Sequence, residues 1–175
     1  MPLNLIKKYP ELLELAHYNE SQRIESLKRI FIRDIQENEN FKFRKKTIRP
    51  IKKEGMDSMD VLFDHLTKKT EFDENNIKKR DCFEMERSRR LHWVKFHVDE
   101  RLSNNLEVFS FEDRLRDRGS VVRTYIFDKV HDYVIILEPQ RSKLDYYLIT
   151  AYLLNEPAGK KSILKKLKNR LQEVY

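Results

Sequence analysis

The spacing of hydrophobic residues changes along the chain, and the change falls near residue 105. Before that point, apolar side chains recur every three or four positions, which is typical of helices that bury one face. In the segment 19–36, Asn19 or Ser21 is the expected N-cap, and Ile24, Leu27, Phe31 and Ile35 share one face. The pattern predicts helices over residues 4–17, where Pro10 interrupts it, over 19–36, and over a short stretch, 57–68, capped by Asp57 or Ser58.

The middle of the chain is predicted to contain an extended segment, a loop and a long helix. Residues 41–51 are extended in character because Pro50 disfavours helical backbone at Arg49. Residues 73–82 are predicted to form a loop. The long helix is predicted from Phe83 to Leu102, although "HWVKFHV" also alternates as a strand would. Its core-facing residues are expected to be Leu91, Val94, Val98 and Leu102.

In the last third of the chain the hydrophobic period is two, as in strands. Short connections between β-branched and aromatic runs favour a four-stranded antiparallel meander over 106–111, 121–128, 132–138 and 145–154. A basic amphipathic helix follows Pro157 and Gly159, and its Ile163, Leu164, Leu167 and Leu171 are expected to be buried. The predicted fold is therefore α+β, with N-terminal helices packed on a four-stranded antiparallel sheet and a basic C-terminal helix. The expected division is a helical segment over 1–40 and a main domain over 41–175.

Composition narrows the class of protein. A chain of 175 residues, 39% hydrophobic and 37% charged, suffices for one domain with a strongly solvated surface. Its single cysteine, Cys82, allows no internal disulfide and fits a reducing compartment. The N-terminus lacks the apolar stretch of a signal peptide, and no segment is long enough to span a bilayer. We therefore expect a cytoplasmic site of action.

Positive charge is concentrated in three separate clusters. The net charge is +7, and residues 41–53 hold seven basic side chains and no acid. Residues 78–90 hold six basic and three acidic side chains, and residues 159–171 hold six basic side chains and no acid. Such clusters indicate a polyanionic partner, most often nucleic acid, although an acidic protein is an alternative.

Hydroxyl and guanidinium groups recur on alternate positions of two predicted strands. In "DYYLITAYLL", Tyr146, Thr150 and Tyr152 fall on one face, whereas Tyr147, Ile149 and Ala151 fall on the other. In "VVRTYIFD", Arg123 and Tyr125 share a face. We expect Arg123, Tyr125, Thr150 and Tyr152 to lie together on a face that helices leave open.

A second candidate group lies in "RSRRLHWVK". His92 is predicted at the edge of the core-facing stripe, near Lys95 and Asp99, where an imidazole could exchange protons at physiological pH. His92 and His97 diverge by about 140° on a helix, so they form a poor metal-ligand pair. No glycine-rich phosphate loop is present, and no cofactor is expected.

Three stretches of the sequence resemble the phage and polymorphic-toxin branch of the barnase–EndoU–colicin–RelE-like nucleases. They are "RSRRLHWVKFHVDE", "VRTYIFDKVHDYVIILEPQ" and "YYLITAYLLNE". The resemblance covers roughly residues 45–172. It implies a metal-independent endoribonuclease that cleaves tRNA or mRNA by 2′-hydroxyl attack, leaving a 2′,3′-cyclic phosphate. His92 would be the general acid or base, Arg123 would bind the phosphate, Thr150 and Tyr152 would hydrogen-bond it, and Tyr125 would stack or relay a proton.

The same resemblance implies further contacts and partners. Nucleic-acid contacts are expected at Arg89, Arg90, Lys95, Lys143, Lys160 and Lys161. A toxin or phage-type effector would have RNA as its substrate, and a cognate immunity or antitoxin protein as a possible partner. Two alternatives use the same basic surface: a non-catalytic nucleic-acid-binding domain, and an interaction protein with an acidic partner.

Overall fold

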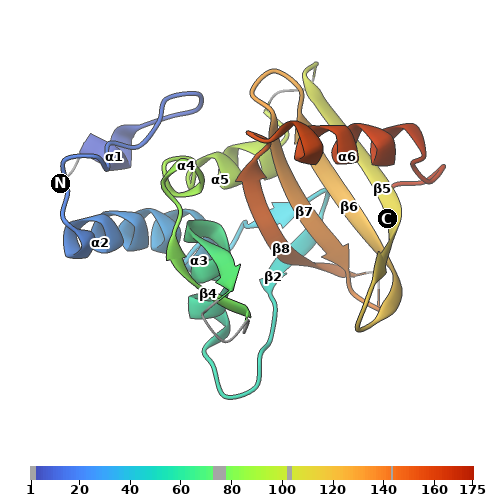
Figure 1. Cartoon of the computed structure of the whole chain (residues 1–175), viewed down its shortest axis with the longest axis horizontal. Helices are drawn as coiled ribbons and strands as arrows, with labels where there is room; N and C mark the ends of the chain where they lie inside the picture. The colour runs from blue at the N-terminus through green and yellow to red at the C-terminus, as the bar shows by residue number, and fades with distance from the viewer. Residues whose placement is uncertain (1–2, 73–77, 102–103, 143) are drawn as a thin grey trace.

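A computed structural model gives the fold of this protein for residues 3–72, 78–101, 104–142 and 144–175, with the side chains of 72 and 78–81 left out. The fold is α+β, built on a curled six-stranded mixed sheet. Most helices gather on one side of the sheet, and the C-terminal helix crosses the other (Figure 1).

The predicted meander forms, but it is part of a larger sheet. Its strands are β5 (Leu106–Leu115), β6 (Gly119–Asp128), β7 (Tyr133–Pro139) and β8 (Asp145–Leu153), and neighbours pair antiparallel. The basic segment after residue 41 adds β1 (Lys42–Phe43) and β2 (Lys46–Pro50). Because β2 pairs parallel to β8, the sheet order is β1-β2-β8-β7-β6-β5. The predicted four-stranded antiparallel sheet was therefore too small.

The helices account for the remaining layers. On the first face lie α1 (Leu3–Ile6), α2 (Glu20–Phe31), the π-helix η1 (Ile32–Gln36), α3 (Ser58–Thr67), α4 (Met85–Ser88) and α5 (Trp93–Val98). On the second face lies α6 (Pro157–Lys168). Within the described ranges, no helix has the length and apolar character needed to cross a membrane.

The helix N-caps expected from the sequence form at Asn19 and Asp57. Asn19 begins α2 with a capping box, in which its side chain accepts from the Gln22 backbone and the Gln22 side chain accepts from the Asn19 backbone. Asp57 begins α3 by accepting from the backbone of Met59 and Asp60. These local bonds satisfy N–H groups that each helix would otherwise leave unpaired.

The predicted N-terminal helix and the predicted loop over 73–82 were wrong in the described parts. Only Leu3–Ile6 is helical, because Pro10 lacks a backbone donor and the chain then extends to bury Leu13 and Leu15. Lys78–Phe83 forms β4, which pairs with β3 (Lys68–Phe72) in a two-stranded hairpin. Residues 73–77 lie outside the described residues.

The long helix predicted over 83–102 is broken between α4 and α5. The backbone N–H groups of Arg90, Leu91, Trp93 and Val94 donate to carbonyls three residues earlier, which winds this stretch more tightly than an α-helix. Leu91, Val94 and Val98 are buried as expected. Leu102 lies outside the described residues.

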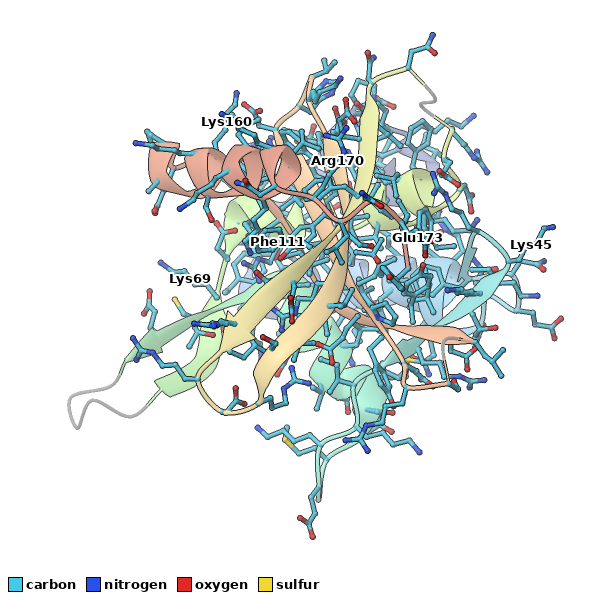
Figure 2. All side chains as sticks on the ribbon, turned by 90° about the vertical axis from the view of Figure 1, so that its right-hand side faces the viewer. Lys45, Lys69, Phe111, Lys160, Arg170 and Glu173 are labelled. Carbon is cyan, nitrogen blue, oxygen red and sulfur yellow. The ribbon has the colours of Figure 1, made fainter. Side chains whose placement is uncertain are left out.

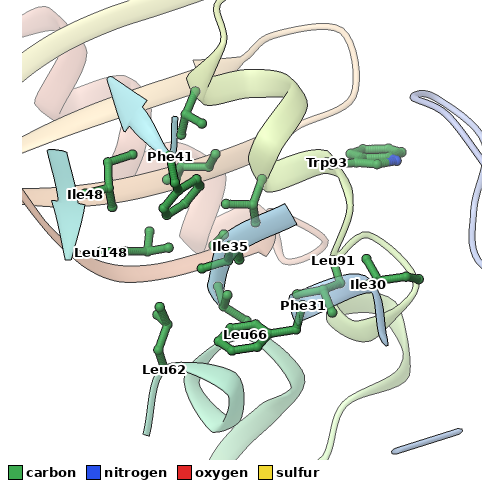
Figure 3. Packing of buried hydrophobic residues seen from close by; sticks show 14 of the residues in the cluster. Ile30, Phe31, Ile35, Phe41, Ile48, Leu62, Leu66, Leu91, Trp93 and Leu148 are labelled. Atoms are coloured by element: carbon green, nitrogen blue, oxygen red, sulfur yellow. The ribbon is translucent and has the colours of Figure 1, made fainter. Parts of the chain in front are cut away.

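The two faces of the sheet have separate hydrophobic clusters. The larger lies under α2, α3 and α5, and it includes residues from before and after position 40, among them Phe31, Phe41 and Leu148 (Figure 3). The smaller lies under α6 and contains Phe109, Tyr125 and Ile163. Leu164, predicted to be buried in α6, is 45% exposed.

A β-bulge in β8 changes which side chains share a face. Ile136 pairs with Thr150 and Leu137 with Leu148, so Ile149 is the extra residue. The extra residue shifts the alternation by one position. The predicted grouping of Tyr146 with Thr150 and Tyr152 was therefore wrong.

Tyr146 packs in the larger cluster, on the face with α2, α3 and α5, and Ala151 packs there too. Ile149 and Tyr152 pack in the α6 cluster.

Candidate nucleic-acid interface

Four predicted site residues share one face of the sheet. Thr150 lies directly across from Ile136, which lies across from Tyr125, so these three form one row. Arg123 and Tyr152 occupy alternate positions on the same face. The face is not open, however, because α6 packs across it.

Tyr125 is fixed beneath α6 and cannot stack on a nucleotide in this structure. It is 0% exposed, and its ring stacks on Phe109 with centroids 5.0 Å apart. Its hydroxyl donates to Asp113, and Lys166 Nζ of α6 donates to that hydroxyl at 2.8 Å. Burial and the bond to Asp113 raise the pKa of the Tyr125 phenol, so the group keeps its proton.

Arg123 lies among carboxylates on the same face. Its Nε is 3.5 Å from Glu138, and its Nη1 is 3.9 Å from Asp113. Arg118 donates to Glu138 as well, and Lys166 is 2.6 Å from Asp113. These contacts already compensate the guanidinium charge, so Arg123 would have to leave them to bind a phosphate.

His92 lies in a different part of the molecule, in the helical layer. It is 5% exposed, not at a groove edge as predicted, and its Nε2 donates to the backbone oxygen of Glu11 at 3.0 Å. Its Nδ1 is buried without a hydrogen-bond partner. Among the described residues, His92 shares no hydrogen-bond partner with Arg123 or Thr150. The structure therefore does not bring His92 together with the other predicted catalytic residues.

We expect His92 to make stability depend on pH between about 4 and 6.5. Burial lowers the pKa of His92 from 6.5 to about 4. The unfolded chain takes up the proton first, so stability is fully present above 6.5 and falls as pH drops toward 4. The loss is up to roughly 3 kcal/mol. Urea unfolding of the wild type and His92→Gln at pH 7 and pH 4.5 measures it. If the lower pH reduces the free energy of unfolding equally in both proteins, the assignment to His92 is contradicted.

A cleft of about 310 Å³ lies where β8 ends, between α4, the β3–β4 hairpin and the start of α6. We call it the β8 cleft. It is lined by Lys69, Glu84, Arg87, Tyr152, Leu153, Leu154, Asn155, Glu156 and Gly159. Lys69 and Lys160 both lie toward this side of the molecule, whereas Lys45 lies at the opposite side (Figure 2).

Arg87 is the central cation of the β8 cleft. Its guanidinium lies 5.5 Å from the centre of the Tyr152 ring. Its Nη1 donates to the backbone oxygens of His65 and Lys68, at 2.9 and 3.1 Å, and to the Thr150 hydroxyl at 3.4 Å. Its Nε is buried without a hydrogen-bond partner. Among the described residues no carboxylate lies within 4 Å of this guanidinium, because Glu84 caps the backbone of α4 instead.

Thr150 and His65 border Arg87 where β8 has no neighbouring strand on this edge. The strand β2 ends opposite Leu148, so the later residues of β8 lie beside α3 instead. Nδ1 of His65 lies 3.0 Å from the Ile149 oxygen, and the Thr150 hydroxyl lies 3.4 Å from the His65 oxygen. A carbonyl oxygen only accepts, so Nδ1 of His65 carries the hydrogen in this contact.

The predicted nucleic-acid contacts are widely distributed, and most of them are ion-paired. Lys95 pairs with Asp99, Arg89 and Arg90 pair with Glu86, and Lys160 pairs with Asp132. Lys161 is exposed on α6 with no acidic partner among the described residues. Lys143 lies outside the described residues.

The sequence interpretation missed Arg87 and His65. Arg87 begins the stretch "RSRRLHWVK", three positions after the capping Glu84, and its contact with Thr150 of β8 joins segments 63 residues apart. His65 carried no signal beyond its place on an amphipathic helix. A larger groove of about 620 Å³ lies between α2 and α3, and its Lys28 and Lys68 pair with Asp60 and Asp64.

Comparison with protein-family models, curated proteins and solved structures finds no match to this chain. Across the described part of the chain, no group of three or more His, Cys, Asp or Glu side chains is placed to hold a metal ion. What is known of the site therefore comes from its own geometry.

Proposed function

We propose that this protein is an endoribonuclease that holds a phosphodiester of RNA in the β8 cleft. The observation that carries the proposal is the Arg87 guanidinium, which has no carboxylate within 4 Å among the described residues and lies beside the Thr150 hydroxyl and the Tyr152 ring. A guanidinium fork matches the geometry of phosphate oxygens, and hydroxyl groups add hydrogen bonds. The resemblance of "YYLITAY", which contains Thr150 and Tyr152, to the toxin-branch nucleases supports the same chemistry.

The proposed reaction is an internal transesterification. A general base accepts the proton of the ribose 2′-hydroxyl, whose oxygen then forms a bond to phosphorus. His65, whose backbone oxygen accepts from Arg87 and Thr150, is the candidate base. The bond from phosphorus to the 5′-oxygen breaks, and that oxygen takes a proton from Tyr152 or from water. Arg87 stabilises the charge that develops on the phosphorus oxygens. Burial raises the pKa of the Tyr152 phenol, which keeps it protonated and able to donate.

A second candidate is RNA binding without cleavage. It is favoured by the burial of His92 and by the carboxylates around Arg123, since these leave fewer proton-transfer groups near Thr150 than the sequence suggested. Basic groups and exposed aromatic rings are sufficient for binding single strands.

Removal of the Thr150 hydroxyl tests the proposal. We expect Thr150→Val, which keeps the shape of the side chain, to lower the cleavage rate about 10- to 100-fold, because Arg87 and the phosphate lose a hydrogen-bonding hydroxyl. Thr150→Ser should keep most of the activity. The measurement is cleavage of total RNA in EDTA, with end-labelling to detect 2′,3′-cyclic phosphates.

Two outcomes count against cleavage at this site. Wild-type protein that binds RNA but yields no cyclic-phosphate ends supports binding alone. Cleavage that Thr150→Val leaves unchanged, in a variant with a wild-type melting temperature, excludes the β8 cleft as the active site.

A further inference from the structure

A second cleft, of about 400 Å³, lies at the other end of β8. Its lining brings together an aromatic ring, two cations and an amide, from Arg49, Pro50, Lys52, Ser58, Gln140 and Tyr147. Tyr147 is half-buried, and within the described residues its ring contacts no other ring or cation and its hydroxyl has no partner. Among the described residues, the ring is therefore not stacked on another ring or cation, and the hydroxyl is not hydrogen-bonded.

Tyr147 lies on the same face of β8 as Tyr152. Its neighbours in the chain, Tyr146 and Leu148, belong to the larger cluster, so Tyr147 points to the opposite face. The bulge at Ile149 brings Tyr152 onto the face of Tyr147, although the two are five residues apart and simple alternation would separate them. At about 3.3 Å per residue, the two tyrosines are about 16 Å apart along the strand.

The charge around this second cleft suits a polyanionic strand. Lys52 has no acidic partner among the described residues, and Arg49 is 56% exposed while it contacts Asp145 at 2.6 Å. The one carboxylate directly across from Tyr147, that of Glu138, already accepts from Arg118 and Arg123. A phosphate that enters this cleft would therefore lie near cations, and the carboxylate across from Tyr147 is already paired with arginine side chains.

We propose that this second cleft stacks an unpaired nucleobase on Tyr147, on the same RNA strand whose phosphodiester occupies the β8 cleft. The inference rests on the proposed function and names its substrate as single-stranded RNA. A base in a duplex is already paired and stacked, whereas an unpaired base offers its ring to an aromatic side chain and its edge to an amide such as that of Gln140. Lys52 and Arg49 bind the phosphates on either side of the stacked base.

The test uses the full chain and a single-stranded RNA with 2′-O-methyl groups, which cannot be cleaved by 2′-hydroxyl attack. Fluorescence anisotropy measures its affinity and that of the same RNA annealed to its complement. We expect the single strand to bind more tightly than the duplex, and Tyr147→Ala to weaken single-strand binding about 5- to 100-fold. Tyr147→Phe, which keeps the ring, should bind as the wild type does.

Three outcomes would overturn the inference: wild-type affinity in Tyr147→Ala, equal affinity for single strand and duplex, or binding of polyglutamate that depends on Tyr147 in the same way. The two proposals fail separately. If the protein cleaves no RNA but binds the methylated strand in a way that depends on Tyr147, only the nuclease proposal is refuted. If cleavage depends on Thr150 but Tyr147→Ala changes neither binding nor cleavage, only the stacking site is refuted.

Discussion

Replacing Arg87 with alanine is expected to lower RNA cleavage by about 100- to 1,000-fold, the largest functional effect of any single change in this protein. Among the described residues, Arg87 has no carboxylate within 4 Å, so its guanidinium is available to the phosphorus oxygens. The affinity for single-stranded RNA should fall as well. Loss of one phosphate contact should lower the slope of log affinity against log salt by about 0.7.

The matched control is Arg89→Ala, two positions along the chain. Arg89 is one-third exposed and lies 3.5 Å from Glu86, so its loss should change cleavage less than twofold. Arg87→Lys should be intermediate, because it keeps the charge but loses the planar fork. Arg87 also bonds the backbone of His65 and Lys68, so the melting temperature of each variant must be measured. A folded Arg87→Ala protein with more than half the wild-type rate would refute the proposed site.

Replacing Asp128 with alanine is expected to lower the free energy of unfolding by about 3–5 kcal/mol. Asp128 and His97 are both 0% exposed, and Nε2 of His97 lies 3.0 Å from the carboxylate. The same carboxylate accepts from the Tyr9 hydroxyl at 2.7 Å and from the backbone of Val130 and His131. Without it, Nε2 of the buried His97 loses its partner, which is costly in a low-dielectric interior, whereas the Tyr9 hydroxyl keeps its contact with Nδ1 of His131.

The same group should make the fold sensitive to strong acid. Burial alone raises the pKa of Asp128, but hydrogen bonds from His97, Tyr9 and the His131 backbone outweigh it and hold the pKa well below 3.8. The contribution to stability is therefore present above about 3.8 and is lost as pH falls toward the folded-state pKa. Urea unfolding at pH 7 and pH 3 measures both effects. The control is Glu107→Gln, which removes an exposed pair with Lys129 and should cost less than about 0.5 kcal/mol. If Asp128→Ala and Glu107→Gln lower the free energy of unfolding by similar amounts, the role given to Asp128 is contradicted.

Local signals in the sequence were sufficient for much of the fold. The period-two runs gave the four strands of the meander, and Asn19 and Asp57 begin their helices as expected, because strand alternation and capping depend on neighbours in the chain. The shared face of Arg123, Tyr125, Thr150 and Tyr152 was also predicted. The single helix over 83–102 failed, since hydrophobic spacing does not distinguish an α-helix from short helices joined by tighter turns.

The sequence by itself determined the α+β class, the order of the four meander strands, and the excess of positive charge that points to a polyanion. Only the tertiary structure decided how the polar groups combine, because contacts between distant segments have no local signature. The bulge at Ile149 sets which hydroxyls share a face, and α6 covers Tyr125. Pairing of β2 with half of β8 leaves the edge where α3 and α4 bring His65 and Arg87 to Thr150.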